Sequence, residues 1–121
     1  MPSSREKHWI TWEESNGVNV VRFTTPDIRD DQVIRTIFEQ IEQLLLDTGR
    51  NNLLLNFAGV DHFASYTIGK LVTLNKRLQP PAGRLALCCL TDVVEEIFDI
   101  MRLRRQFNIY RNEQDALESF E

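Results

Sequence analysis

The spacing of apolar residues along this chain alternates between that of β-strands and that of α-helices. The first segment has the pattern of a β-hairpin. Aromatic and β-branched residues are frequent in 8–14 and 18–24, two stretches separated by Asn16 and Gly17. An Asn-Gly pair tolerates the positive φ angles that a tight hairpin turn requires. The pattern therefore predicts two antiparallel strands at the start of the fold.

A long amphipathic helix is predicted next. Its apolar residues are three or four positions apart, which places them on one face of a helix. These residues are Val33, Ile34, Ile37, Phe38, Ile41, Leu44 and Leu45. Asp30 or Asp31 is expected to cap the N-terminus, where a carboxylate accepts backbone N–H groups, and Gly49 is expected to end the helix.

The alternation of strand and helix continues to the end of the chain. Short apolar runs predict strands, and spacings of three and four residues predict helices between them. The expected strands are 52–57, 84–90 and 107–110, and the expected helices are about 66–78, one capped by Thr91 or Asp92, and one capped by Asn112.

Gly69 lies inside the predicted helix 66–78, where glycine costs about 1 kcal/mol relative to alanine. We therefore expect the helix backbone to approach a neighbouring element closely at Gly69. Residues 61–65, which precede this helix, are expected to form a loop.

The order of the predicted elements is ββαβαβαβα over residues 1–121, and no linker is long enough to divide the chain. Strands that alternate with helices favour an α/β fold with a central, mostly parallel β-sheet flanked by helices. The initial hairpin would add an antiparallel edge to that sheet. We expect a single domain.

Composition and charge exclude several classes of protein. Hydrophobic residues make up 42% and charged residues 26%, as in globular proteins, and the formal net charge is -4. An acidic chain is poorly suited to phosphate backbones, and the longest apolar run, 85–90, is too short to span a membrane. Residues 1–7 lack the apolar stretch of a signal peptide. We expect a cytoplasmic protein that binds neither nucleic acid nor membrane.

The two cysteines, Cys88 and Cys89, are adjacent in the chain. Neighbouring residues of a strand point to opposite faces, so a disulfide between them is geometrically poor. We interpret them as small apolar core residues in a reducing compartment. Neither His8 nor His62 is accompanied by ligands at metal-binding spacing, so no metal or other cofactor is expected.

The chemically distinctive segment runs from Asn56 to Leu71. A buried strand enters a loop, and Ser65 stands where the following helix begins, so its hydroxyl can cap that helix. Asp61 and His62 lie in the same loop. A hydrolase triad is not favoured, because the Gly-x-Ser-x-Gly turn is missing and residues this close in one loop rarely align for catalysis.

This segment resembles the switch segment of the STAS domain, the family of anti-sigma factor antagonists and sulphate-transporter regulatory domains. The family pattern is an apolar strand ending in Asp or Asn, followed by aromatic-apolar-Asp-Ser-(Ser/Thr)-Gly-(Leu/Ile)-Gly at the start of a helix. The matching residues here are Leu53, Leu54, Leu55 and Asn56, then His62 to Gly69, and Leu71. The order and spacing of the other elements agree along nearly the whole chain.

The resemblance implies a STAS fold and a non-enzymatic anti-sigma factor antagonist that regulates transcription indirectly. Ser65 would be phosphorylated by a partner that is both an anti-sigma factor and a serine kinase, with a histidine-kinase-like ATPase fold. A serine phosphatase would reverse the modification. The unmodified antagonist would hold the kinase partner and free a sigma factor. The partner-binding residues would be Asp61, His62, Tyr66, Thr67 and Lys70.

The segment departs from the family pattern at Ala64, Tyr66 and Thr67, which stand where Asp, Ser or Thr, and Gly are usual. Two interpretations therefore stay open. Ser65 is a phosphoacceptor, with Tyr66 or Thr67 as alternative acceptors, or Ser65 is a plain N-cap in an unphosphorylated STAS scaffold or interaction module. Formation of a homodimer and nucleotide binding are also left open.

Overall fold

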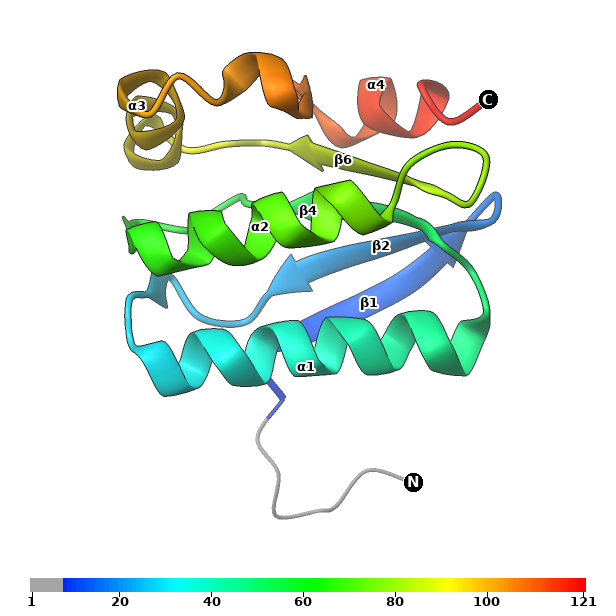
Figure 1. The fold of residues 1–121 in the computed structure, drawn as a ribbon, viewed down its shortest axis with the longest axis horizontal. Helices are drawn as coiled ribbons and strands as arrows, with labels where there is room; N and C mark the ends of the chain where they lie inside the picture. Colours follow the sequence, from blue (N-terminus) through cyan, green and yellow to red (C-terminus); the bar gives the residue numbers. More distant parts are fainter. Residues whose placement is uncertain (1–7) are drawn as a thin grey trace.

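Five strands form the central sheet, in the spatial order β1-β2-β4-β6-β7 (Figure 1). The computed structural model describes residues 8–121. The strands are β1 (Ile10–Ser15), β2 (Val18–Phe23), β4 (Asn52–Asn56), β6 (Arg84–Cys88) and β7 (Asn108–Tyr110). β1 pairs antiparallel with β2, and every other pairing in this sheet is parallel. The predicted hairpin and the mostly parallel sheet are therefore confirmed.

Four α-helices cover the two faces of this sheet. They are α1 (Asp31–Thr48), α2 (Ser65–Arg77), α3 (Asp92–Ile100) and α4 (Glu113–Glu118), and a short 3-10 helix covers Arg104–Gln106. In Figure 1, α1 and α2 lie side by side in front of the sheet. The short α4 packs on the opposite face, where Ala116 contacts the buried side chains of β2, β4 and β6.

Side-chain caps and a left-handed glycine set the ends of three helices. Asp30 accepts a hydrogen bond from the backbone N–H of Val33 at the start of α1, and Gly49 ends that helix with a φ of 66°. Thr91 caps α3 and Asn112 caps α4 in the same manner. These residues are the ones that the sequence predicts, because short polar side chains can accept the unpaired amides of a first turn.

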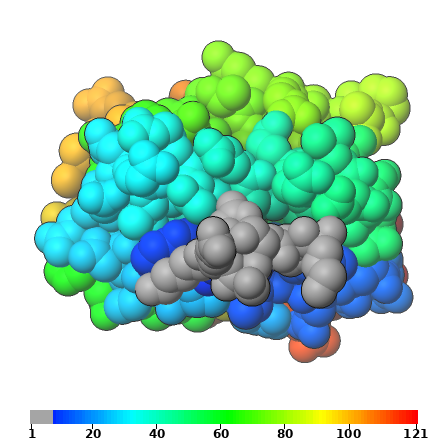
Figure 2. Space-filling model, turned by 90° about the horizontal axis from the view of Figure 1, so that it is seen from below, coloured from blue at the N-terminus to red at the C-terminus, as the bar shows by residue number. Residues whose placement is uncertain are grey.

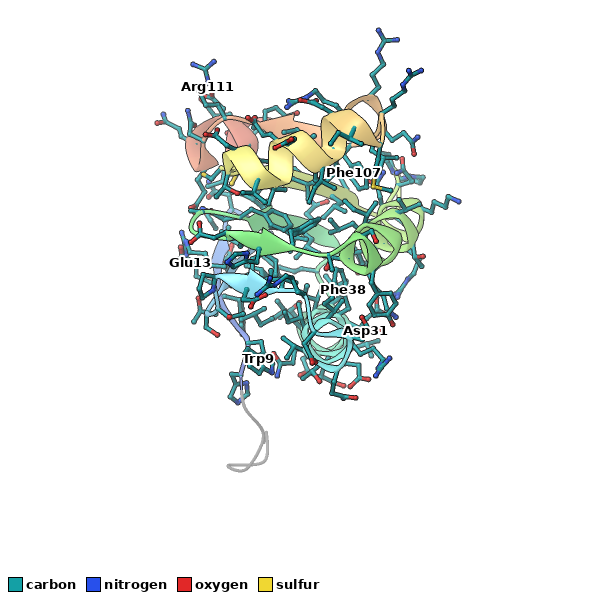
Figure 3. All side chains as sticks on the ribbon, turned by 90° about the vertical axis from the view of Figure 1, so that its left-hand side faces the viewer. Trp9, Glu13, Asp31, Phe38, Phe107 and Arg111 are labelled. Carbon is teal, nitrogen blue, oxygen red and sulfur yellow. The ribbon has the colours of Figure 1, made fainter. Side chains whose placement is uncertain are left out.

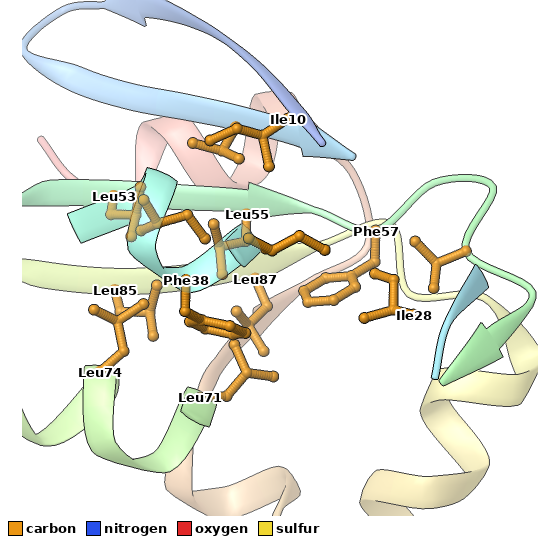
Figure 4. Close-up of a cluster of buried hydrophobic side chains, with 14 of the residues drawn as sticks. Ile10, Ile28, Phe38, Leu53, Leu55, Phe57, Leu71, Leu74, Leu85 and Leu87 are labelled. Atoms are coloured by element: carbon orange, nitrogen blue, oxygen red, sulfur yellow. The ribbon is translucent and has the colours of Figure 1, made fainter. Parts of the chain in front are cut away.

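The hydrophobic core lies between the sheet and the three longer helices. Leu53 and Leu55 of β4 pack in the cluster that faces α1 and α2 (Figure 4). Leu54 packs in the cluster that α4 covers, and all three leucines are fully buried. Burying a leucine side chain stabilises a fold by about 1.5–3 kcal/mol. The central strand therefore contributes to the stability of both layers at once.

The molecule seen from below shows α1 beside the N-terminal hairpin (Figure 2). One contact between them is a hydrogen bond of 3.1 Å from the backbone N–H of Trp9 to the side-chain oxygen of Gln40. Residues 1–7, on which the expectation of no export signal rests, lie outside the described residues. Within 8–121, no helix has the length and apolarity needed to cross a membrane.

Two short strands were not predicted. β3 (Asp27–Ile28) and β5 (His62–Phe63) pair in parallel and form a separate two-stranded sheet, so part of the expected loop 61–65 is a strand. Ile28 and Phe63 are buried and join the main core. A two-residue strand is too short to show a period of two, which is why the sequence pattern missed both.

Two expectations about side-chain placement are wrong. A Cβ atom added at Gly69 would meet nothing within 4 Å, so the α2 backbone makes no close approach there. Cys88 and Cys89 do not point to opposite faces, because Cys89 follows the end of β6 with a φ of 58° and packs against the same buried cluster as Cys88. The alternation of a strand no longer applies after the strand has ended.

Gly83 is the glycine at which the fold requires the absence of a side chain. A Cβ atom there would lie 2.2 Å from the carbonyl oxygen of Asn51. We expect Gly83→Ala to lower the free energy of unfolding by about 1–3 kcal/mol, the usual cost of forcing extra atoms into a packed site. Urea denaturation measures this change, and an unchanged midpoint would contradict the close approach.

Gly69→Ala is the matched substitution, for which we expect a change of opposite sign in the free energy of unfolding. The position is exposed, lies within α2 and has free space, so alanine should raise the free energy of unfolding by up to about 1 kcal/mol through its higher helix propensity. The same denaturation experiment measures it. Destabilisation by Gly69→Ala would mean that a neighbouring group does approach the helix at this point.

Candidate functional site

The candidate site is the end of the molecule where β4 stops and α2 begins, which faces the viewer in Figure 3. Asn56, the last residue of β4, accepts a hydrogen bond of 2.9 Å from the backbone N–H of Ala58. Its amide nitrogen donates to Glu113 of α4 at 2.8 Å. One polar side chain thus closes the turn that leaves the sheet and joins the sheet to α4.

The Glu113 carboxylate also holds the neighbouring strand. Arg22 of β2 donates two hydrogen bonds to it, at 2.5 Å and 2.8 Å, and forms an ion pair with Glu13 of β1 at 3.0 Å. The bonds to Glu113, and then those to Glu13, raise the pKa of Arg22 above its usual value. The underside of the site is therefore a connected polar network across β1, β2, β4 and α4.

Backbone hydrogen bonds fix the segment between β4 and α2. The carbonyl oxygen of Pro26 accepts the N–H groups of Asp61 and His62, and the carbonyl oxygen of Ile28 accepts that of Ala64. Phe63 packs edge-on against Phe57, with ring centroids 5.9 Å apart. These contacts therefore fix the position at which α2 begins.

Ser65 is exposed and is the first residue of α2. The prediction that Ser65 caps this helix is wrong, because the N-cap is Ala64, whose backbone is extended at φ -97° and ψ 151°. Alanine has no side-chain acceptor, so no side-chain hydrogen bond caps the helix. The first turn of α2 therefore combines an exposed hydroxyl with backbone amides that no capping side chain satisfies.

Thr67 is in the wrong place for the role that the sequence assigned to it. It is only 2% exposed, and its hydroxyl has no hydrogen-bond partner in the described part of the chain. Thr67 cannot reach a partner surface, nor serve as an alternative acceptor, without leaving the core. A signal was present in the sequence, since Thr67 precedes the buried Leu71, Leu74 and Leu78 by four, seven and eleven positions.

The other four predicted partner-binding residues lie on the surface around Ser65. Asp61 and His62 are exposed, and Tyr66 and Lys70 are half-buried. The Lys70 ammonium lies 5.6 Å from the centre of the Tyr66 ring, within the range of a cation–π contact. We call Asp61, His62, Ser65, Tyr66 and Lys70 the switch surface.

Sequence reasoning missed two surface features, an ion pair next to His62 and an exposed apolar residue of α3. Asp27, which pairs with His62 in the small sheet, is bound by the Arg29 guanidinium at 2.8 Å and 2.9 Å, and this contact lowers the pKa of the Asp27 carboxyl. The exposed apolar residue is Ile100, which is 71% exposed. The signal for the second feature is that α3 has more apolar residues than its single buried face can hold.

Metal ligands and the three residue types of a hydrolase triad were both searched for among the described residues. Among residues 8–121, no three His, Cys, Asp or Glu side chains come close enough together to hold a metal ion. Nor does a hydrogen bond within that range link Asp61, His62 and Ser65 to one another. The arrangement offers instead a supported surface on which Ser65 is exposed.

Comparisons with known proteins agree on the family. The family model for the STAS domain matches residues 10–116. A protein of Thermotoga neapolitana, named as an anti-sigma factor antagonist and homolog of TM1081, is 32% identical over 73 residues. That match covers 60% of this chain and 65% of the relative, so the chain spans slightly less than two thirds of the relative's length.

Solved structures share the fold. TM1081 of Thermotoga maritima, a protein named as an anti-sigma factor antagonist, superposes with a TM-score of 0.79 at 20% identity, over 93% of this chain and 95% of that one. The Bacillus cell fate determinant SpoIIAA in its phosphorylated form gives 0.67 at 17% identity, over 93% and 99%. The family match, the predicted ββαβαβαβα order and these superpositions lead to one conclusion: the chain belongs to the STAS domain family.

Proposed function

We propose that this protein is an anti-sigma factor antagonist whose switch surface binds an anti-sigma factor that is also a serine kinase, and that phosphorylation of Ser65 ends the binding. The observation that carries the proposal is the exposed hydroxyl at the uncapped start of α2. A kinase must enclose its acceptor hydroxyl, so exposure is the first requirement. The names of the Thermotoga proteins and of SpoIIAA, which is also named as an anti-sigma factor antagonist, support the same role.

A phosphate on Ser65 would be tolerated by this protein but would not fit a partner surface that binds the unmodified serine. A phosphate adds about 1.5 to 2 negative charges at pH 7. Next to Ser65 it would meet the first-turn amides of α2, where the helix dipole favours an anion. The α2 helix itself is held by the buried Ile68 and Leu71, so the modification would change the surface without unfolding the helix.

At the interface the same phosphate would act against binding. A partner surface that fits a small neutral hydroxyl would have to bury an unpaired dianion, and burying an unpaired charge is costly. A loss of about 1.4 kcal/mol already weakens binding tenfold. Release of the kinase partner would follow from this local repulsion, and a serine phosphatase would restore binding.

The proposal gives the protein no catalytic step of its own and places it in the cytoplasm with its kinase partner, which we expect to have a histidine-kinase-like ATPase fold. The contact surface is the predicted one without Thr67, which is buried. Formation of a homodimer is not required, because the switch surface is built from one chain.

One observation favours a second candidate, an unphosphorylated STAS scaffold. Ala64 stands before Ser65 where the family pattern has a carboxylate, and that carboxylate could guide a kinase. In a scaffold, the switch surface would bind its partner permanently. Phosphate content in the native cell separates the two candidates, because the scaffold carries none.

Ser65→Asp should weaken binding to the cognate kinase partner at least tenfold, because a carboxylate brings part of the charge of a phosphate to the interface. Ser65→Ala should bind as tightly as the unmodified protein. Isothermal titration calorimetry with the purified partner measures both. Gln114→Asp is the matched control, since it adds the same charge to the first turn of α4 on the opposite face and should leave affinity unchanged.

Incubation with the kinase partner and ATP should add phosphate to Ser65 and leave Thr67 unmodified, because a buried hydroxyl cannot enter a kinase active site. Tandem mass spectrometry of the digested protein locates the phosphate. Phosphate on Tyr66 or Thr67, or phosphorylation that persists in the Ser65→Ala variant, would contradict the assignment of Ser65.

A further inference from the structure

Two cysteines follow one another at the end of β6, at the same edge of the sheet as Asn56, with which Cys88 pairs, but the proposed switch assigns them no role. Cys88 is the last residue of β6 and Cys89 follows it, and both are free cysteines. Cys88 is fully buried, whereas Cys89 is half-buried. One of the two sulfur atoms therefore lies in the core and the other lies at its margin.

The backbone turns at Cys89 so that the second thiol stays on the side of the first. Cys89 has a φ of 58°, in the left-handed region that few residues other than glycine adopt. Its N–H donates to the carbonyl oxygen of Tyr110 at 3.3 Å, which holds this conformation in place. As a result both cysteines pack against one cluster, formed with Ala116 of α4.

The two thiol groups also influence each other. Burial raises the pKa of the Cys88 thiol above its usual range, and the Cys89 thiol raises it further. Charge from Glu113 acts in the same direction, and Arg22 acts in the opposite one. The geometric observation beside this shift is the packing of both side chains against one cluster.

We propose that Cys88 and Cys89 form a dithiol site for trivalent arsenicals. Thiol sulfur is a soft ligand that prefers thiophilic centres. A three-coordinate arsenic centre is pyramidal and takes two sulfur ligands on the same side, which suits thiols of adjacent residues on one face. A linear two-coordinate ion would need the sulfur atoms on opposite sides. The half-buried Cys89 gives the reagent its point of entry.

The reaction is a condensation without oxidation or reduction. Each S–H bond breaks, each sulfur forms a bond to arsenic, and the two protons leave with the oxygen of the arsenical as one molecule of water. The arsenic stays trivalent and the cysteines stay at the thiol oxidation level.

Phenylarsine oxide tests the proposal on the folded, full-length protein. We expect one arsenical group per chain by intact mass spectrometry, retained in an excess of glutathione and removed by dithiothreitol. A monothiol cannot displace a group held by two sulfur atoms as readily as a dithiol can. Circular dichroism before and after the reaction shows whether the fold is kept.

Cys89→Ser is the decisive variant, since this position lies at the margin of the core and a serine hydroxyl is close in size to the thiol. It should lose the arsenical to glutathione at least tenfold faster than the wild type. Cys88→Ser should also lose the arsenical faster. Because Cys88 is buried and its substitution can disturb the core, Cys89→Ser is the variant that decides the test. Equal release from wild type and Cys89→Ser, or no adduct on the folded wild type, would overturn the proposal and leave the proposed function untouched.

Discussion

The structure depends most on the burial of β4 and on the way Asn56 ends it. The three leucines of β4 are covered on both faces, so this strand sets the separation of the two helical layers. At its carboxyl end the Asn56 side chain bonds to the next turn through its oxygen and to Glu113 through its nitrogen. Because the strand is buried and its last residue is hydrogen-bonded on both sides, the segment that follows begins at a fixed position. The position of Ser65 follows from it.

Elements in which a regular hydrophobic pattern extends over many residues could be predicted from the sequence. The stripe of α1 extends over several turns, and the caps Asp30, Thr91 and Asn112 are short polar residues in front of such stripes. The parallel sheet follows from the alternation of strands and helices. The order of the five strands depends on pairing between strands that are distant in the sequence. The ββαβαβαβα pattern restricts that order only through the general rules for how connections cross a sheet.

Details of the candidate site could not be predicted, because contacts distant in the sequence decide them. The N-cap is Ala64 since its N–H is bound by Ile28, a residue of a strand too short to be recognised. That single-residue shift changes Ser65 from a cap into an exposed first residue. It also sets the phase in which Thr67 faces the core. The arrangement of the two cysteines likewise depends on one left-handed residue beyond a strand.

The two outer strands of the sheet have a consequence for how this protein can meet others. β7 has three residues, too few to template a neighbour, and β1 carries adjacent carboxylates at Glu13 and Glu14. Charged or very short outer strands discourage the addition of a foreign strand. Growth of the sheet into a fibre or a strand-swapped pair is thus disfavoured at both borders, and recognition is left to the helices and loops.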